Sequence, residues 1–425
     1  MAGQKSIPRG KLERRRVVGL AAARAGVKKV GHLTVRPFLS ARKRCAADQA
    51  NDVAVARIVF RALSTLRGTA LKAAQLVAME RGLVPEIYRC ELAKASCDVP
   101  PMNRALVYTI LKRELGPPEK SFRQFEWCPF AAASLGQVHA ATAFDGRRLA
   151  VKVQYPGMAD GVKADIEMLR RCLGPTRYRR IFDGCFDEIA SKVGEELDYR
   201  LEARQTTAFA KGCPMRDILI PEVATDLSTG SVLSLGRIEG LHLDGWLATS
   251  PSQAERDRYG QLLVDFFHYG AFVQNVIHAD PHPGNYLFRE DGRLGVIDFG
   301  CVKHLEPGLL KDLRRLSSPP AHIDLAEHTA LHGRIGIHYR RGIDDPSFVR
   351  FFSDWVAWLG EPYRREVFDF GPRHDYFRRG AVLAKALYRY IDHYDGSFIY
   401  YGRAEHGLMR LLEHLSARVR MRPIV

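Results

Sequence analysis

The sequence contains no uninterrupted apolar stretch of the roughly 18 residues that a transmembrane helix requires. Its most apolar long segment, residues 262–277, is interrupted by Asp265, His268, Gln274 and Asn275. A secretory leader, with a charged start followed by an apolar core, is not visible near the first methionine either. We therefore expect any association with a membrane to be peripheral.

Cysteine is thinly spread along the chain. The eight cysteines form no Cys-x-x-Cys pair and adjoin no His-x-x-x-His spacing, so the sequence indicates neither a structural zinc site nor a disulfide framework. A reducing compartment is the default, and we expect a cytoplasmic protein. Attachment to the inner face of a membrane and an organelle transit sequence are the alternatives.

Acidic residues are almost missing from residues 1–44, which hold thirteen lysines and arginines and one glutamate. This segment contributes +12 of the net charge of +16, so the rest of the chain is nearly balanced. A basic arm of this kind could contact an anionic membrane face, bind nucleic acid or act as a transit sequence. A solvated flexible tail fits the composition equally well.

A catalytic-loop pattern lies between residues 276 and 300. The run His-Ala-Asp-Pro-His-Pro-Gly-Asn places Asp280 five residues before Asn285, and Asp298 begins an Asp-Phe-Gly after a short apolar strand. This spacing is typical of a phosphotransfer loop followed by a metal-binding aspartate.

The residues between these two motifs predict a β-hairpin with arms at 286–288 and 294–297. Asn285 and Asp298 would face each other across it and supply the hard oxygen ligands that Mg²⁺ prefers. Asp280 would then orient or deprotonate an attacking hydroxyl or water. Ordinary Asp and Asn residues in turns are the alternative, which the pairing of two motifs thirteen residues apart disfavours.

Glycine is missing where a phosphate-binding loop would have it. Ala131, Ala132, Ala133 and Ser134 stand in that loop, and the strand after it carries Lys152 between two valines. Alanine does not readily adopt positive φ, so we expect a stiff loop close to the phosphates. Lys152 would neutralise those phosphates if a carboxylate held it in place; a lysine that points to solvent is the alternative.

Candidate partners for this lysine follow in residues 189–209, which predict one long helix with four acids: Glu195, Glu196, Asp198 and Glu202. One of them could fix Lys152, and a solvated acidic face is the alternative. Beyond a strand near residue 232, backbone groups up to Glu239 could meet the edge of an adenine. Helical periodicity is also clear over residues 52–80 and 101–115 and beyond residue 307. In the first of these helices Lys72 and Gln75 share a face, which by itself predicts only a polar surface.

Five segments in this order strongly resemble the UbiB family of atypical protein-kinase-like proteins, also described as aarF-domain-containing or ADCK-type kinases. They are Ala131-Ala-Ala-Ser-Leu-Gly-Gln-Val-His, Val151-Lys-Val-Gln, Glu196-Leu-Asp-Tyr-x-x-Glu202, His278-Ala-Asp-Pro-His-Pro-Gly-Asn and Asp298-Phe-Gly. The resemblance implies an α+β, two-lobed protein-kinase-like fold with an N-terminal helical extension and a helical C-lobe. We expect a basic, flexible arm at 1–50, a helical extension at 51–125, a kinase-like N-lobe with inserted helices at 126–240 and a helical C-lobe at 241–425.

The resemblance also assigns roles. Lys152 would pair with Glu202, Asp280 would be the catalytic aspartate, and Asn285 and Asp298 would hold Mg²⁺. The nucleotide would contact Lys152, Glu239 and the loop from Ala131 to Ser134. Lys72 and Gln75 would lie over the active site and face Glu196 and Asp198, although Ala74 stands where the family motif has glycine and Gln205 where it often has asparagine.

These features predict a Mg-ATP-dependent (or ADP-dependent) atypical kinase or ATPase that supports the biosynthesis of ubiquinone, another isoprenoid lipid or a related secondary metabolite. The expected partners are a nucleotide, an isoprenoid or quinone lipid or its biosynthetic enzymes, and an anionic membrane surface through residues 1–44; nucleic acid is not expected. No Ala-Pro-Glu follows Asp-Phe-Gly, which argues against an ordinary protein kinase. A small-molecule phosphotransferase and a nucleotide-gated scaffold with little catalysis remain as alternatives.

Overall fold

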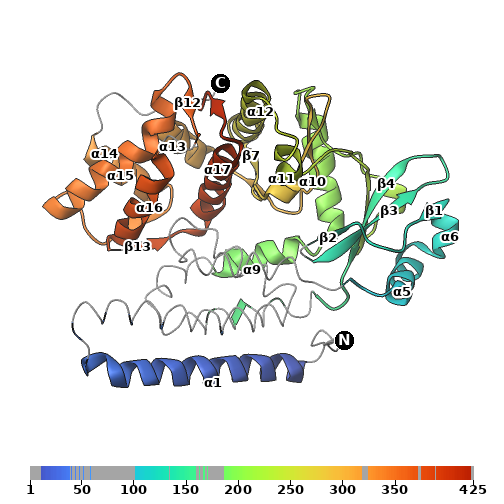
Figure 1. Ribbon diagram of the computed structural model, residues 1–425, viewed down its shortest axis with the longest axis horizontal. Helices are drawn as coiled ribbons and strands as arrows, with labels where there is room; N and C mark the ends of the chain where they lie inside the picture. The colour runs from blue at the N-terminus through green and yellow to red at the C-terminus, as the bar shows by residue number, and fades with distance from the viewer. Residues whose placement is uncertain are drawn as a thin grey trace.

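The computed structural model describes residues 11–38, 40, 44, 47, 51, 58, 101–133, 135–158, 162, 166, 167, 170, 186–317, 324–371, 375–387 and 389–422. Lys72, Gln75, Ser134 and most of the helix predicted over residues 52–80 lie outside this set. The described residues form an α+β fold with two lobes, as predicted (Figure 1).

The smaller lobe is built on an antiparallel sheet. Its strands follow the order β1 (Gln124–Phe125), β3 (Gly136–Thr142), β4 (Arg148–Gln154) and β6 (Val232–Gly236), with β2 (Ala131–Ala133) paired to β3. Alternation along β4 buries Val151 and Val153 against α5 (Arg104–Leu115), which is followed by α6 (Pro118–Ser121). Lys152 therefore lies on the opposite face of the sheet.

Residues 189–209, part of which packs on that opposite face, do not form the single helix that was predicted. The structure has two helices, α9 (Phe186–Glu195) and α10 (Tyr199–Gly212). Asp198 separates them, because its side chain accepts a hydrogen bond from the backbone N–H of Arg200 and caps α10. Tyr199 of α10 then packs against β6.

The larger lobe is mainly helical. Its helices are α11 (Leu243–Leu247), α12 (Gln253–Phe272), α13 (Pro307–Ser317), α14 (Leu325–Arg334), α15 (Pro346–Arg364), α16 (Tyr376–Leu387) and α17 (Gly396–Leu415). A short 3-10 helix, η5 (Pro283–Asn285), lies in this lobe, whereas η4 (Thr225–Leu227) packs on β6 of the smaller lobe. One aromatic-rich core joins these helices, with Phe352, Trp358 and Leu412 among its buried members.

Short strands place the loops of this lobe. Two-stranded pairs form between β7 (Val276–His278) and β10 (Val302–His304), between β11 (Ile337–Tyr339) and β13 (Ile391–Tyr394), and between β12 (Phe368–Asp369) and β14 (Arg418–Val419). A three-stranded sheet has β9 (Leu294–Val296) in the middle, antiparallel to β8 (Tyr286–Phe288) and parallel to β5 (Ile218–Leu219). The pairing of β8 with β9 confirms the hairpin predicted between the two polar motifs.

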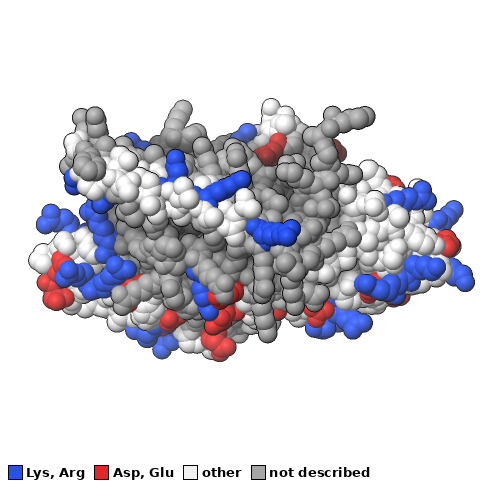
Figure 2. Space-filling model, turned by 90° about the horizontal axis from the view of Figure 1, so that it is seen from below, with Lys and Arg blue, Asp and Glu red and all other residues white. Residues whose placement is uncertain are grey.

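The basic N-terminal segment, expected to be flexible, forms helix α1 (Lys11–Val35), followed by η1 (Arg36–Phe38). No proline interrupts α1, which permits a continuous helix. Arg16, Arg24 and Lys28 are exposed on it, and so are Leu20 and Val27. Figure 2 views the molecule from the side on which α1 lies and shows lysine and arginine side chains there. Within the described part of the chain, no helix has both the length and the apolar character to cross a membrane.

Candidate active site

A buried ion cluster joins the sheet of the small lobe to α10 and to the Asp-Phe-Gly segment. The Nζ of Lys152 lies 2.9 and 3.0 Å from the two carboxylate oxygens of Glu202 and 3.2 Å from Oδ2 of Asp298. The ion pair between Lys152 and Glu202 that the resemblance implied is therefore present. In the sequence, Glu202 lies 50 positions and Asp298 146 positions from Lys152.

Burial dominates the electrostatics of this cluster. The side chain of Glu202 is 1% exposed, and burial raises its pKa to about 7, while Lys152 lowers it and the Asp298 carboxylate raises it further. Burial would lower the pKa of Lys152, but the carboxylates of Asp298 and Glu202 raise it well above its ordinary value. Lys152 is thus a fixed cation at the base of the site.

The Asp-Phe-Gly segment is held by aromatic packing. Phe299 is fully buried, and its ring lies 5.0 Å from Phe209 of α10 and 5.3 Å from the ring of His278. Burial lowers the pKa of His278, and its Nε2–H donates to the backbone carbonyl of Asp298, because a carbonyl oxygen can only accept. The helix that carries Glu202 and the segment that carries Asp298 therefore position each other.

The catalytic loop lies directly beside this cluster. The amide Nδ2 of Asn285 donates to the backbone carbonyl of Asp280 over 2.9 Å, and the N–H of Ile297 donates to the carbonyl of Asn285 over 3.1 Å. Asn285 is consequently fixed at the end of the β8–β9 hairpin next to Asp298, with Oδ1 left as an acceptor. An amide oxygen and a carboxylate that is 34% exposed form a donor set that fits Mg²⁺.

Arg403 is a site residue that the sequence analysis missed. It lies on α17, its side chain is 2% exposed, and its Nη2 is 2.5 Å from Oδ1 of Asp280. The pair orients the carboxylate that the sequence singled out as catalytic. A signal was present in the sequence, because Arg403 follows the apolar pair Tyr400 and Tyr401, so that a charge stands among the buried residues of α17.

The alanine-rich loop forms a tight hairpin. Ala131 is paired with Val138 and Val138 with Lys152, so the three residues lie in register across β2, β3 and β4. At the turn Gly136 allows a close approach of strands, because a Cβ there would collide with the carbonyl oxygen of Val153.

Three other predicted residues have clear positions. The carboxylate of Glu239 lies 2.5 Å from Nη2 of Arg148 and is 58% exposed, and its backbone carbonyl accepts from Arg289 over 2.8 Å. Glu196 is buried near Glu202, and its charge contributes to the raised pKa of Glu202. Asp198 caps α10. The orientation of the last two toward Lys72 and Gln75 remains a prediction, since that segment lies outside the described residues.

A strand lysine paired with a helical glutamate, a catalytic loop with aspartate and asparagine, and an Asp-Phe-Gly aspartate beside the lysine together define a protein-kinase-like site. The family model described as the ABC1 atypical kinase-like domain matches residues 94–327. The chain belongs to this family of atypical kinase-like proteins.

Curated relatives bear similar descriptions. An aarF domain-containing protein kinase from Arabidopsis thaliana, described as chloroplastic, is 34% identical over 250 residues, which cover 56% of this chain and 34% of the relative. The chloroplastic protein ACTIVITY OF BC1 COMPLEX KINASE 8 from the same plant is 30% identical over 257 residues, 58% of this chain and 34% of that protein. A Mycobacterium tuberculosis protein is 31% identical over 258 residues, 58% of this chain and 53% of the relative. The chain thus spans between a third and about a half of these relatives.

A solved structure covers more of the fold. The complex of Rv3197 with erythromycin from Mycobacterium tuberculosis has a TM-score of 0.58 and 27% sequence identity, and the similarity covers 90% of this chain and 97% of that chain.

Proposed function

We propose that this protein is a Mg-ATP-dependent atypical kinase or ATPase that supports the metabolism of a quinone or another isoprenoid lipid at a membrane surface. The observation that carries the proposal is the cluster of Lys152, Glu202 and Asp298 beside the loop of Asp280 and Asn285. Membership of an atypical kinase-like family supports the phosphotransfer chemistry.

Each of these side chains has a role in the proposed reaction. Magnesium-bound ATP supplies the phosphoryl group. Lys152, oriented by Glu202, neutralises phosphate charge, and Asn285 and Asp298 would hold the metal ion. Asp280 accepts a hydrogen bond from the attacking water or hydroxyl, and the guanidinium of Arg403 holds its carboxylate in place.

The proposed membrane role has its support in α1. Exposed basic side chains, among them Arg24 and Lys28, alternate there with exposed Leu20, Val27 and Val30. Cations attract anionic lipid headgroups, and the apolar side chains gain from insertion between them. Together they favour a peripheral contact with an anionic surface.

The test is steady-state ATP hydrolysis by the full chain with Mg²⁺, with and without liposomes that contain an anionic lipid. Asp298→Asn is the blank, and Asp354→Asn, an exposed aspartate on α15, is the matched control. We expect turnover that rises on liposomes, vanishes in Asp298→Asn and persists in Asp354→Asn. No turnover above the blank, together with retained nucleotide binding, would instead favour a nucleotide-gated scaffold.

A small-molecule phosphotransferase is the second candidate. The similarity to a structure of Rv3197 in complex with erythromycin favours a bulky natural product as the acceptor or ligand to try first. Phosphorylated erythromycin, detected by mass spectrometry after incubation with Mg-ATP, would support this candidate. An unchanged macrolide, together with lipid-stimulated hydrolysis, would leave the first proposal in place.

A further inference from the structure

Two histidines face each other on a strand pair of the large lobe, away from the active-site cluster. His338 of β11 is in register with His393 of β13, and their rings stack with centroids 4.3 Å apart and 12° between their planes. Both are partly exposed, with 35% and 44% of the side chain accessible. The neighbouring residues in the two strands, Ile337 and Tyr394, are instead buried in the core.

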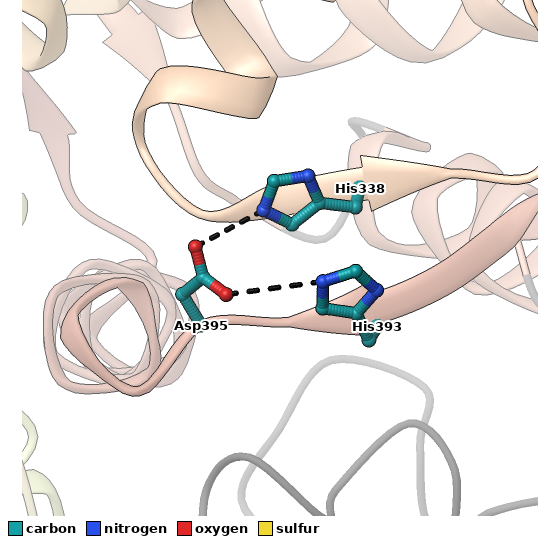
Figure 3. Close-up of side chains that lie close together, drawn as sticks. All are labelled: His338, His393 and Asp395. Atoms are coloured by element: carbon teal, nitrogen blue, oxygen red, sulfur yellow. Dashed lines mark hydrogen bonds and ion pairs between the residues drawn. The ribbon is translucent and has the colours of Figure 1, made fainter.

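A carboxylate lies between the ends of these rings. Asp395 follows β13 and is the N-cap residue of α17, yet its side chain makes no capping hydrogen bond. Its oxygens point to the histidines: Oδ2 lies 3.0 Å from Nε2 of His338, and Oδ1 lies 3.9 Å from Nε2 of His393 (Figure 3). Three possible ligand atoms from two strands and a helix terminus therefore converge.

A second carboxylate orients one of the rings. The Nδ1 of His393 lies 3.0 Å from Oδ2 of Asp392, and Nε of Arg340 lies 3.5 Å from the other oxygen of Asp392. An Nδ1–H that donates to a carboxylate leaves the lone pair of Nε2 free to bind a cation. In proteins, carboxylates of this kind orient histidines that ligate metals.

We propose that His338, His393 and Asp395 bind a divalent transition-metal ion, with Zn²⁺ as the favoured occupant and water as the remaining ligand. The three ligand atoms lie within 4.8 Å of one another, and no other group of three or more such residues meets this condition within the described ranges. Bonds of about 2.0–2.2 Å to zinc need ligand atoms roughly 3.3 Å apart, which small side-chain rotations at a half-exposed site provide. Two imidazoles suit zinc, whereas Mg²⁺ prefers oxygen, so the ion of a nucleotide would not compete.

A metal ion here would fix the start of α17. Gly336 permits the close approach of Asp395, because a Cβ at Gly336 would lie 2.8 Å from the Cβ of Asp395. Further along α17, Arg403 contacts Asp280, and Gly407 packs so tightly on Pro281 that a Cβ would collide with it. The proposed site thus anchors the helix that supports the catalytic loop, and it does not depend on the identity of the substrate.

The test is a competition titration of the untagged full chain with Zn²⁺ against a chromophoric chelator, in excess Mg²⁺, together with Co²⁺ absorption as a report on ligand geometry. We expect one saturable site, visible d–d bands with Co²⁺, and a higher melting temperature in Zn²⁺. His338→Ala and His393→Ala should each lose the site, and Asp392→Asn should weaken it by about 10- to 100-fold.

His414→Ala is the matched control, since His414 also lies beside a carboxylate, with Nε2 3.4 Å from Asp244, but at the other end of α17. It should bind zinc as the unmodified chain does. Melting curves without metal check that each variant folds. Absence of a saturable site in the unmodified chain, or binding that survives in both His338→Ala and His393→Ala, would overturn the proposal.

Discussion

The ion pair between Arg403 and Asp280 allows a quantitative test of the site. Arg403→Met removes the guanidinium and keeps most of the apolar length of the side chain. Breaking a buried ion pair by removing one partner costs about 3–5 kcal/mol of the free energy of unfolding. The side chain of Asp280 is 14% exposed, so water can partly solvate its carboxylate. We therefore expect the free energy of unfolding to fall by about 3 kcal/mol, the lower end of this range.

The assay is urea-induced unfolding followed by tryptophan fluorescence. Arg410→Met is the matched control, because Arg410 lies on the same helix, is 49% exposed and pairs with Glu413 over 2.5 Å. A surface pair of this kind contributes about 0.2–1 kcal/mol. In the double variant Arg403→Met with Asp280→Asn, the loss should be smaller than the sum of the two single losses, because both charges are gone.

Activity separates the orienting role of Arg403 from its structural one. Arg403→Lys keeps a positive charge but lacks the planar fork that holds a carboxylate in one orientation. We expect this variant to keep most of its stability and to lose turnover at unchanged nucleotide affinity. The reasoning would be refuted if Arg403→Met unfolded within about 1 kcal/mol of the unmodified chain, since that is the range of an exposed pair.

Three further predictions follow from the same site. The folded-state pKa of Glu202, about 7, exceeds its ordinary 4.5, so the folded protein takes up this proton as pH falls through 7. Nucleotide affinity, measured by calorimetry, should fall over that range, and a flat profile would contradict the role of ionised Glu202. Gly136→Ala should cost about 1–3 kcal/mol by crowding Val153, measured as a lower urea midpoint, whereas Gly194→Ala, with open space around it, should not. Asp298→Asn should abolish the binding of a fluorescent Mg-nucleotide far more than Lys72→Ala does. Equal losses would show that the extension, and not the metal ligand, governs binding.

Comparison of the α9–α10 region with the prediction shows where local patterns fail. Helical periodicity continues across residues 189–209, but Asp198 caps a new helix in the middle of this range. Periodicity reports which residues face the core, and it persists when one helix ends and another begins at a similar angle. The residues by themselves therefore left four acids as candidates for the partner of Lys152. The family resemblance pointed to Glu202, and the packing of α10 against β6 brings its carboxylate to the lysine.

The sequence by itself determined the local parts of this protein. The β8–β9 hairpin, the strand of Lys152 and the spacing of Asp280, Asn285 and Asp298 all follow from turn chemistry and alternation, which act over a few residues. Family membership followed from the same motifs.

Only the tertiary structure decided the long-range contacts. Arg403 lies 123 residues from Asp280, and His338 lies 57 residues from Asp395. The apolar neighbours of Arg403 mark it as a charge among buried residues, but no local pattern identifies Asp280 as its partner or Asp395 as the partner of His338. Such pairs form because the hydrophobic core fixes how distant helices and strands pack. The helix or strand that carries a polar side chain then determines which other residue it can reach. The sequence shows which side chains can carry a charge or bind a metal ion, but the fold determines which of them contact each other.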